Sequence, residues 1–567
     1  MSRRQYESFD ILDVARKGMN YITSMVDEKY DFLPYWFIQI NEAPAYAKHV
    51  RVDDAELVGS WYEALSALHK MTGATDRSLL VLAGLKTHLL RSWGPHGLRF
   101  HEPYPWSNTN HASFHEMGWI LAGMNRLQAD EPDNAEVEKR ISELVRGLRG
   151  LVLQRKIRTF WSGDFPIDEP IFEFPADIYI REGGFVPERI TGRGEECIRN
   201  AVLLEPLVTR AVRRGDKVAL ELAEGIANHM IGLSRYFSWD SHYFGHVHSA
   251  VWFAIGLLKL GRHLQRPRYI EKAVRIFEFT KSMSSEFGWV PEYARWCPES
   301  ENHCETCCIK DMVEFALEAV ELGYDYWDLI NKYTRNQFSE QQVKTGCFIA
   351  VDNTRPDKDG HTWRDMDQRV VGGWSGGGEP NSLSLSRFRS IAGCCVGTAP
   401  VGFWLVWEKI VQDTADGVFV NLPIDRDHPA ARVETGYPNT GLLRVTARKA
   451  GVYRLRPHPW MGARLELTVD GRHVPVTYAG GCILVENVAS GAVIELRHDL
   501  AERVTKETVR GLELSITWRG ADVVRMDPPG LPLMLYQREA GVPKSYPKPI
   551  GTASSGPMVM KPTDQKK

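Results

Sequence analysis

Apolar residues recur at helical spacing through most of the first 415 residues. In the stretch 54–72, Leu57, Trp61, Leu65 and Leu68 follow one another at intervals of three and four, and Gly73 follows as a stop signal. This periodicity predicts about twelve helices. Besides 54–72, they cover residues 11–26, 76–92, 111–128, 135–155, 195–213, 216–235, 246–265, 268–285, 306–322, 325–338 and 398–412. Pro206 should distort one of them, and no sequence repeat of fixed period is present.

After about residue 416 the period changes to the alternation that is typical of strands. The predicted strands are 417–422, 442–447, 452–456, 465–469, 482–487, 493–497, 511–518 and 531–537, and Asp470-Gly471 should form a hairpin turn. Residues 416–550 are therefore expected to form a β-sandwich domain. The polar tail 551–567 is rich in Gly and Pro and is expected to be disordered.

Twelve helices in antiparallel pairs suit an (α/α)6 barrel over residues 1–415, with six inner and six outer helices. The predicted fold class is thus mainly α with β: an (α/α)6 barrel followed by a C-terminal β-sandwich. Such barrels carry their sites on the loops at one end. Polar and aromatic residues gather in four predicted loops, and the candidate substrate contacts among them are Trp106, His111, His246, His248 and Trp374.

The sequence supports a functional role for some of these histidines more strongly than for others. A histidine in a loop is more often a structural hydrogen-bonding group than a catalyst. His246 and His248 stand above this expectation because both precede an amphipathic helix at a predicted barrel mouth. His115-Glu116 lacks the second histidine that a zinc-protease helix requires, so no metal role is predicted for it.

Composition narrows the class of protein. The chain has 567 residues, 43% hydrophobic and 25% charged, with a formal net charge of −3. This balance gives no electrostatic case for nucleic acid or an anionic membrane as a partner. No signal-peptide core and no run of 18 apolar residues occurs, so a cytoplasmic protein is expected, in which cysteines stay reduced.

The strongest chemical signal is a pair of cysteine clusters. Five of the nine cysteines lie in Cys304-Glu305-Thr306-Cys307-Cys308 and in Cys394-Cys395. Thiolates bind zinc strongly, and a carboxylate can complete the set. A helix from 306 would place Glu305 and Cys307 at its positive end, and a Gly393-Cys394-Cys395 turn could offer two sulfurs. We predict one Zn²⁺ site formed by Glu305, Cys307, Cys394 and Cys395. The alternative is that the cysteines are small buried hydrophobic residues; an odd number of cysteines in a long chain disfavours a disulfide framework.

These motifs resemble those of glycoside hydrolase family 127, which contains β-L-arabinofuranosidases. The resemblance rests on Glu305-Thr306-Cys307, on Gly393-Cys394-Cys395, on the amphipathic helix 400–410 and on Asp416–Leu422. Arg456–Trp460 in the β region adds to it. It is strong over about 285–425, fair in the β region and weak before about 190. It implies an (α/α)6 barrel with β-sandwich domains and a zinc ion on three cysteines and one glutamate.

The resemblance also implies residue roles. Glu305, Cys307 and Cys395 resemble zinc ligands, Cys394 resembles a ligand that is also the nucleophile, and Glu292 is the best match to the acid/base. This sequence departs from the family pattern between Glu292 and Glu305, where the segment is shorter and carries additional cysteines. The additional cysteines of this segment are Cys297 and Cys304, and the role of Cys308, which follows it, is also open. Glu299 and Glu301 stay as reserve acid/base candidates.

The implied activity is a retaining glycoside hydrolase acting on an L-arabinofuranoside or a similar sugar, with a small carbohydrate or oligosaccharide as substrate. Two other classes stay open. One is a hydrolase or lyase with a zinc-bound water, which four protein ligands disfavour. The other is a carbohydrate-binding protein that has lost activity and keeps a structural zinc. The sequence determines neither the sugar nor the oligomeric state, for which a homodimer is one candidate.

Overall fold

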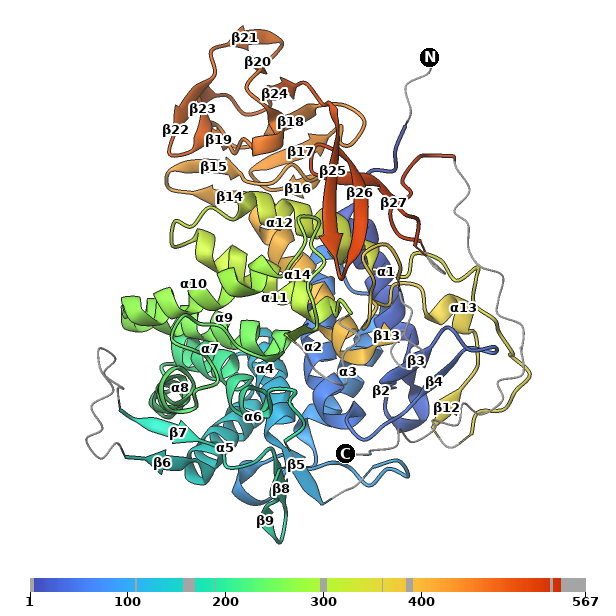
Figure 1. The fold of residues 1–567 in the computed structure, drawn as a ribbon, viewed down its shortest axis with the longest axis vertical. Helices are drawn as coiled ribbons and strands as arrows, with labels where there is room; N and C mark the ends of the chain where they lie inside the picture. Colours follow the sequence, from blue (N-terminus) through green and yellow to red (C-terminus); the bar gives the residue numbers. More distant parts are fainter. Residues whose placement is uncertain are drawn as a thin grey trace, which may run out of the picture.

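The computed structural model describes residues 5–107, 110–156, 169–188, 190–295, 303–358, 360–383, 391–530 and 534–541. Several predictions concern residues outside these ranges: Cys297, Glu299, Glu301 and the tail 551–567. Figure 1 shows a large helical region and a strand-rich region at one end of it. No helix in the described ranges is long and apolar enough to cross a membrane.

Six helices of the described chain form a closed inner ring. Each contacts the next, and the last contacts the first, in the order α2 (Val58–Thr72), α4 (Phe114–Asp130), α7 (Leu204–Arg214), α9 (Val247–Leu264), α11 (Thr306–Val320) and α14 (Gly393–Ile410). The inner helices are buried along most of their length because other helices or the barrel axis cover nearly every face.

An outer layer of amphipathic helices covers this ring. It consists of α1 (Ile11–Ser24), α3 (Asp76–Leu90), α5 (Ala135–Leu151), α8 (Lys217–Asn228), α10 (Pro267–Ser282) and α12 (Trp327–Tyr333), each in contact with an inner helix. In α5, for example, Val137, Ile141, Leu144 and Leu148 are buried at the spacing of one helix face. The predicted (α/α)6 barrel is confirmed.

Two predicted helices begin or break at other positions. The stretch 195–213 forms two helices, α6 (Glu195–Ala201) and α7, and the break precedes Pro206 so that the proline lies in the first turn of α7. Proline is tolerated there because the first N–H groups of a helix have no partner within it. The helix expected at 398–412 begins at Gly393 and carries Pro400 in its interior.

Short strands in the connecting loops join segments that are far apart in the sequence. β3 (Phe37–Gln39) pairs with β13 (Ile391–Ala392), which leads directly into α14. β10 (Gly245–His246) pairs with β11 (Tyr293–Ala294), with His246 opposite Tyr293. Glu292 is the residue before Tyr293. The pairing of β10 with β11 therefore places Glu292 beside the start of α9.

The strand-rich region follows α14 and forms three antiparallel or mixed sheets. The first has the order β14 (Val411–Thr414), β15 (Gly417–Val420), β19 (Gly451–Leu455), β23 (Cys482–Val488) and β22 (Thr477–Ala479). The second has the order β16 (Arg426–His428), β17 (Ala431–Thr435), β18 (Leu442–Ala447), β24 (Val493–His498), β20 (Leu465–Val469) and β21 (Arg472–Val474). The third contains β25 (Glu502–Val509), β26 (Leu512–Arg519) and β27 (Asp522–Asp527).

The pattern within the strands agrees with the sequence prediction. In β18, Leu443, Val445 and Ala447 are buried and alternate with partly exposed residues, so one face of the sheet is covered. The predicted turn at Asp470-Gly471 joins β20 to β21, with positive φ at both residues. In Figure 1, β25–β27 extend from the sheets down beside the helical region.

Candidate metal centre and active site

Four predicted ligands converge at one point. The ligand atoms of Glu305, Cys307, Cys394 and Cys395 all lie within 4.8 Å of one another, and all four residues are buried. The sulfurs of Cys307 and Cys395 are 3.6 Å apart, and Glu305 Oε1 lies 3.5 Å from Cys394 Sγ. Three thiols and one carboxylate form a donor set that suits zinc in tetrahedral coordination. The residues of this cluster therefore fit a zinc ion.

The cluster lies where two inner helices begin. Glu305 is the N-cap of α11 and Cys307 lies in its first turn, as predicted. Cys394 and Cys395 lie in the first turn of α14. The first peptide N–H groups of both helices have no partner within the helix, and their dipoles favour negative charge at this point. Thiolates and a carboxylate are stabilised there by both helices.

The predicted Gly-Cys-Cys turn was wrong in one respect, because these residues are helical. A side chain at Gly393 would place its Cβ 2.7 Å from the methyl carbons of Leu57, so any other residue there would require the Leu57 side chain to move. The Trp61 indole donates to the Gly393 carbonyl at 3.0 Å, which fixes the start of the helix. The two sulfurs therefore come from consecutive residues of a helical turn.

Burial and mutual hydrogen bonding divide the protons unevenly among the thiols. Burial raises the pKa of the Cys307 thiol well above its usual value. Burial also opposes charge on Cys395, but hydrogen bonds from Cys307 and Cys394 outweigh it and lower the pKa of Cys395 to about 6. The Thr398 hydroxyl lies 3.4 Å from Cys307 Sγ and can donate to it. At Cys394 the hydrogen bond with Cys307 favours the anion, but the hydrogen bond to Cys395 and burial outweigh it and raise the pKa of Cys394 well above its usual value. Of the three thiols, only Cys395 therefore has a lowered pKa.

A cavity of about 310 Å³ opens beside this cluster. It is lined by Glu292, Glu305, His246, His248 and, among the cysteines of the cluster, by Cys394. The cysteines differ in exposure, because 8% of the Cys394 surface is accessible and none of that of Cys307 or Cys395. The volume is in the range of small-ligand sites.

Glu292 and His246 meet the cluster on one wall of this cavity. Oxygen atoms of Glu292 and Glu305 and a ring nitrogen of His246 lie within 4.8 Å of one another. His246 Nε2 is 3.1 Å from Glu305 Oε2, and its Nδ1 is 3.0 Å from Ser249 Oγ. Burial lowers the pKa of His246 to about 4 although Glu305 opposes this shift. His246 is therefore neutral at pH 7 and fixes Glu305 through a hydrogen bond.

Charged residues to which the sequence analysis assigned no role form another wall of the cavity. Glu56, His115, Glu116 and Asp177 line it. His115 Nε2 lies 3.6 Å from Glu56 Oε2, and this carboxylate raises the pKa of His115 although burial opposes it. The sequence pattern around His115-Glu116 excludes a zinc-protease motif but does not by itself indicate a place in the cavity. The available signal was its place at the start of a predicted helix, on the same end of the barrel as His246.

Three predicted substrate contacts do not line the cavity. Trp374 is fully buried; its indole donates to the Phe338 carbonyl at 3.3 Å, so it belongs to the core. Trp106 stacks on His49, with ring centroids 4.4 Å apart. His111 lies behind the cavity, 3.1 Å from the guanidinium of Arg51, which does line it. These residues were predicted from the polarity of their loops, which does not show which way a side chain points.

Of the remaining cysteines, Cys304 and Cys308 are buried beside the cluster. Cys304 Sγ accepts a hydrogen bond from the Val290 amide at 3.3 Å. Cys308 Sγ lies 3.8 Å from Glu305 Oε2 and outside the four-ligand group. The glycine-rich stretch 372–379 packs against this region, since Gly378 exchanges both backbone hydrogen bonds with Cys304.

No protein-family profile and no curated protein matches the sequence. A GH127 β-arabinofuranosidase matches with a TM-score of 0.57 at 15% identity, covering 91% of this chain and 81% of the other. A GH127 β-L-arabinofuranosidase from Geobacillus stearothermophilus T6 matches with a TM-score of 0.54 at 15% identity, covering 92% and 82%. The chain has the fold of the GH127 enzymes.

A third structure, described as a glycoside hydrolase, matches with a TM-score of 0.60 at 13% identity, covering 92% of this chain and 81% of that one. All three likenesses extend over both the helical barrel and the strand-rich region, because each covers more than nine-tenths of the chain. At these identities they establish the shared fold. The chemistry has to be argued from the residues of the cavity.

Proposed function

We propose that the chain is a retaining glycoside hydrolase that acts on an L-arabinofuranoside or a similar sugar. The observation that carries the proposal is that Cys394, alone among the three clustered cysteines, reaches the cavity into which Glu292 also projects. A nucleophile and a carboxyl group on one small cavity are the two groups that a double displacement requires. The GH127-like fold supports the same chemistry.

The residues would act in two steps. In the first, the Cys394 thiolate attacks the anomeric carbon, and Glu292 gives its proton to the departing glycosidic oxygen. In the second, Glu292 takes a proton from a water molecule whose oxygen displaces the sulfur. Two displacements at one carbon retain its configuration. Glu292 is only 2% exposed, so it acts in a site from which most water is excluded.

A zinc ion on Glu305, Cys307, Cys394 and Cys395 would supply one property, which is to keep the thiols deprotonated at neutral pH. The other requirements fall on the chain itself. The start of α11 and the start of α14 orient the four ligands, and His246 holds Glu305 in place. The charged wall of Glu56 and His115 offers hydrogen-bonding partners for sugar hydroxyl groups.

The decisive experiment traps the covalent intermediate. We expect Glu292→Gln to react with a nitrophenyl β-L-arabinofuranoside, because a good leaving group needs little protonation, and then to stall for lack of a base. Intact-mass spectrometry should show a sugar adduct that maps to Cys394. Cys394→Ser should form no adduct, whereas Cys347→Ser, at an exposed cysteine outside the ligand cluster and the cavity, should behave as the native protein.

Several outcomes would contradict the proposal. An adduct on Cys395 or on a carboxylate would reassign the nucleophile. Full turnover by Cys394→Ser would exclude cysteine catalysis. No turnover and no adduct across a panel of aryl glycosides, in protein with bound zinc, would favour a structural metal in a non-catalytic protein.

A further inference from the structure

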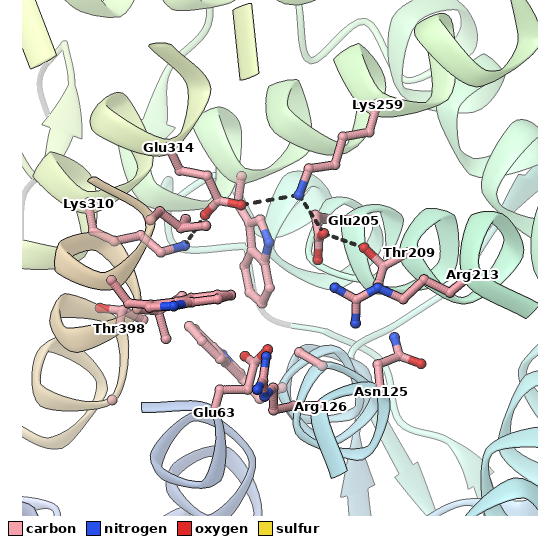
Figure 2. A pocket seen from close by; sticks show the side chains of 17 residues that line it. Glu63, Asn125, Arg126, Glu205, Thr209, Arg213, Lys259, Lys310, Glu314 and Thr398 are labelled. Atoms are coloured by element: carbon pink, nitrogen blue, oxygen red, sulfur yellow. Dashed lines mark hydrogen bonds and ion pairs between the residues drawn. The ribbon is translucent and has the colours of Figure 1, made fainter. Parts of the chain in front are cut away.

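The axis of the barrel beneath the site is occupied by charged side chains. Figure 2 shows them converging from the inner helices on a second cavity of about 110 Å³. Lys259 Nζ on α9 lies 2.9 Å from Glu205 Oε1 on α7 and 3.2 Å from Glu314 Oε1 on α11. Glu314 Oε2 in turn lies 2.7 Å from Lys310 Nζ. Glu205, Lys259, Glu314 and Lys310 thus form a continuous row of alternating charge, which we call the axial ion-pair row.

Asp311 connects this row to the active-site cavity. Lys310 Nζ lies 3.1 Å from Asp311 Oδ1, and the other oxygen of Asp311 is hydrogen-bonded to His248 Nδ1. Asp311 is fully buried. Its two carboxylate oxygens are therefore divided, one toward the row and one toward the histidine.

His248 is held at one ring nitrogen and packed against two indoles. Its ring stacks with Trp119 and Trp252, with centroids 5.5 Å and 5.4 Å away, and these two indoles lie 4.4 Å from each other on the same side of it. Asp311 holds Nδ1, while the buried Nε2 has no hydrogen-bond partner among the described residues. His248 lines the active-site cavity. When one ring nitrogen is bound to a carboxylate, the other is held in a defined direction and protonation state.

Stability alone does not account for this arrangement. Removing several charges from water costs free energy that their mutual attraction offsets only in part, and apolar side chains of similar size often stabilise a core as well or better. We propose that Asp311 is a positioning residue that aims His248 Nε2 at a hydroxyl group of the bound sugar. The axial ion-pair row fixes Asp311 for that task. The inference rests on the proposed glycosidase function, since it assigns His248 a substrate contact in the same cavity.

A kinetic test compares variants that break the row with variants that keep it. Asp311→Asn and Lys310→Met should lower kcat/KM by about 10-fold or more, mainly through KM, because they disturb a hydrogen bond to substrate and leave Glu292 intact. Lys310→Arg keeps the charge and should retain most of the activity. Glu321→Gln, which removes an exposed carboxylate at the end of the same helix, serves as the matched control.

A spectroscopic test does not depend on turnover. In protein labelled with ¹⁵N-histidine, the His248 Nδ1–H proton should give a downfield signal that His248→Gln removes. Asp311→Asn should abolish this signal and Lys310→Met should shift it, while Lys310→Arg and Glu321→Gln should preserve it. If the protein hydrolyses no glycoside, this measurement still tests the Asp311–His248 link.

Two results would overturn the inference. One is an unchanged His248 signal together with native kcat/KM in Asp311→Asn. The other is an equal loss of activity in Lys310→Met and Lys310→Arg that follows an equal fall in melting temperature, which would assign the row to stability alone.

Discussion

At the scale of single residues, accessibility separates side chains that have the same chemistry. Cys307 and Cys395 are sealed from solvent, whereas Cys394 reaches the cavity, so Cys394 is the one sulfur of the three that a molecule in the cavity can contact. The carboxylates divide in the same way. Glu305 lies in the ligand group, and Glu292 lies within 4.8 Å of it on the same cavity without joining that group.

A metal-removal prediction follows at this scale. We expect purified native protein to contain one zinc ion per chain, and Cys307→Ser to lose it together with several kcal/mol of unfolding free energy, because metal binding is coupled to folding. Elemental analysis and thermal unfolding measure both quantities. Cys197→Ser, at another fully buried thiol, is the control and should keep its zinc. Zinc-free native protein of unchanged stability would refute the prediction.

The ligand residues were accessible to sequence reasoning for a physical reason. Thiolate pairs and a Glu-x-Cys at a helix start are rare chemical combinations, and the helix positions follow from local periodicity. The stacking of Trp106 on His49 and the burial of Trp374 depend on tertiary packing, which a single sequence does not reveal. The charged wall with Glu56 was missed because this residue lies beside a helix whose apolar face dominates its pattern.

At the scale of elements, single inner helices contribute both to the cavity and to the axial ion-pair row. α11 provides both, with Glu305 and Cys307 at its start and Lys310, Asp311 and Glu314 further along. α14 packs beside it and supplies the other two sulfurs. The helix α11 therefore connects the ligand cluster at one end of the barrel to the axial ion-pair row.

Glu314 allows a pH prediction. Burial opposes its charge, but Lys310 and Lys259 outweigh burial and lower its pKa from 4.5 to about 2. The unfolded chain therefore binds the proton more tightly, and the stabilisation is complete above about pH 4.5 and is lost as the pH falls toward 2. A shift of this size corresponds to about 3 kcal/mol.

The test compares unfolding at several pH values. Glu314→Gln should be less stable than the native protein at pH 7, and the difference should shrink between pH 5 and pH 3. Urea-induced unfolding followed by tryptophan fluorescence would measure it. Glu271→Gln is the control, because water solvates this exposed side chain in the folded and unfolded states alike. A difference that stays constant with pH would contradict the assigned pKa.

Helix existence was predictable and helix limits were less so. Strong periodicity identified the inner helices, and the stop at Gly73 matches the end of α2. The helix expected at 398–412 begins earlier, at Gly393, where the chain packs against Leu57, and it contains Pro400 in its interior. Contacts of this kind between distant segments override local signals.

At the scale of the whole molecule, the strand-rich region is joined to the barrel through buried charges. Arg335 follows α12 in a π-helical turn (Thr334–Phe338), and its Nη1 lies 3.1 Å from both oxygens of Asp522, the first residue of β27. Arg538 Nη1 also lies 3.1 Å from Asp522 Oδ1. One carboxylate thus binds two buried guanidinium groups, and the alternation that predicts strands contains no information about this contact.

This junction carries the last prediction. Asp522→Asn keeps the shape of the side chain but leaves Arg335 and Arg538 buried with less compensating charge, which should cost about 3–5 kcal/mol. Asp499→Asn removes a carboxylate from an exposed pair with Arg464 in the same region and should cost about 0–1 kcal/mol. Thermal unfolding monitored by near-ultraviolet circular dichroism would show a much lower melting temperature only in the first variant. Because the arginine lies on the helical side, Arg335→Met combined with Asp522→Asn should recover part of the loss. Equal melting temperatures for Asp522→Asn and Asp499→Asn would mean that apolar packing, and not this charge cluster, holds the two regions together.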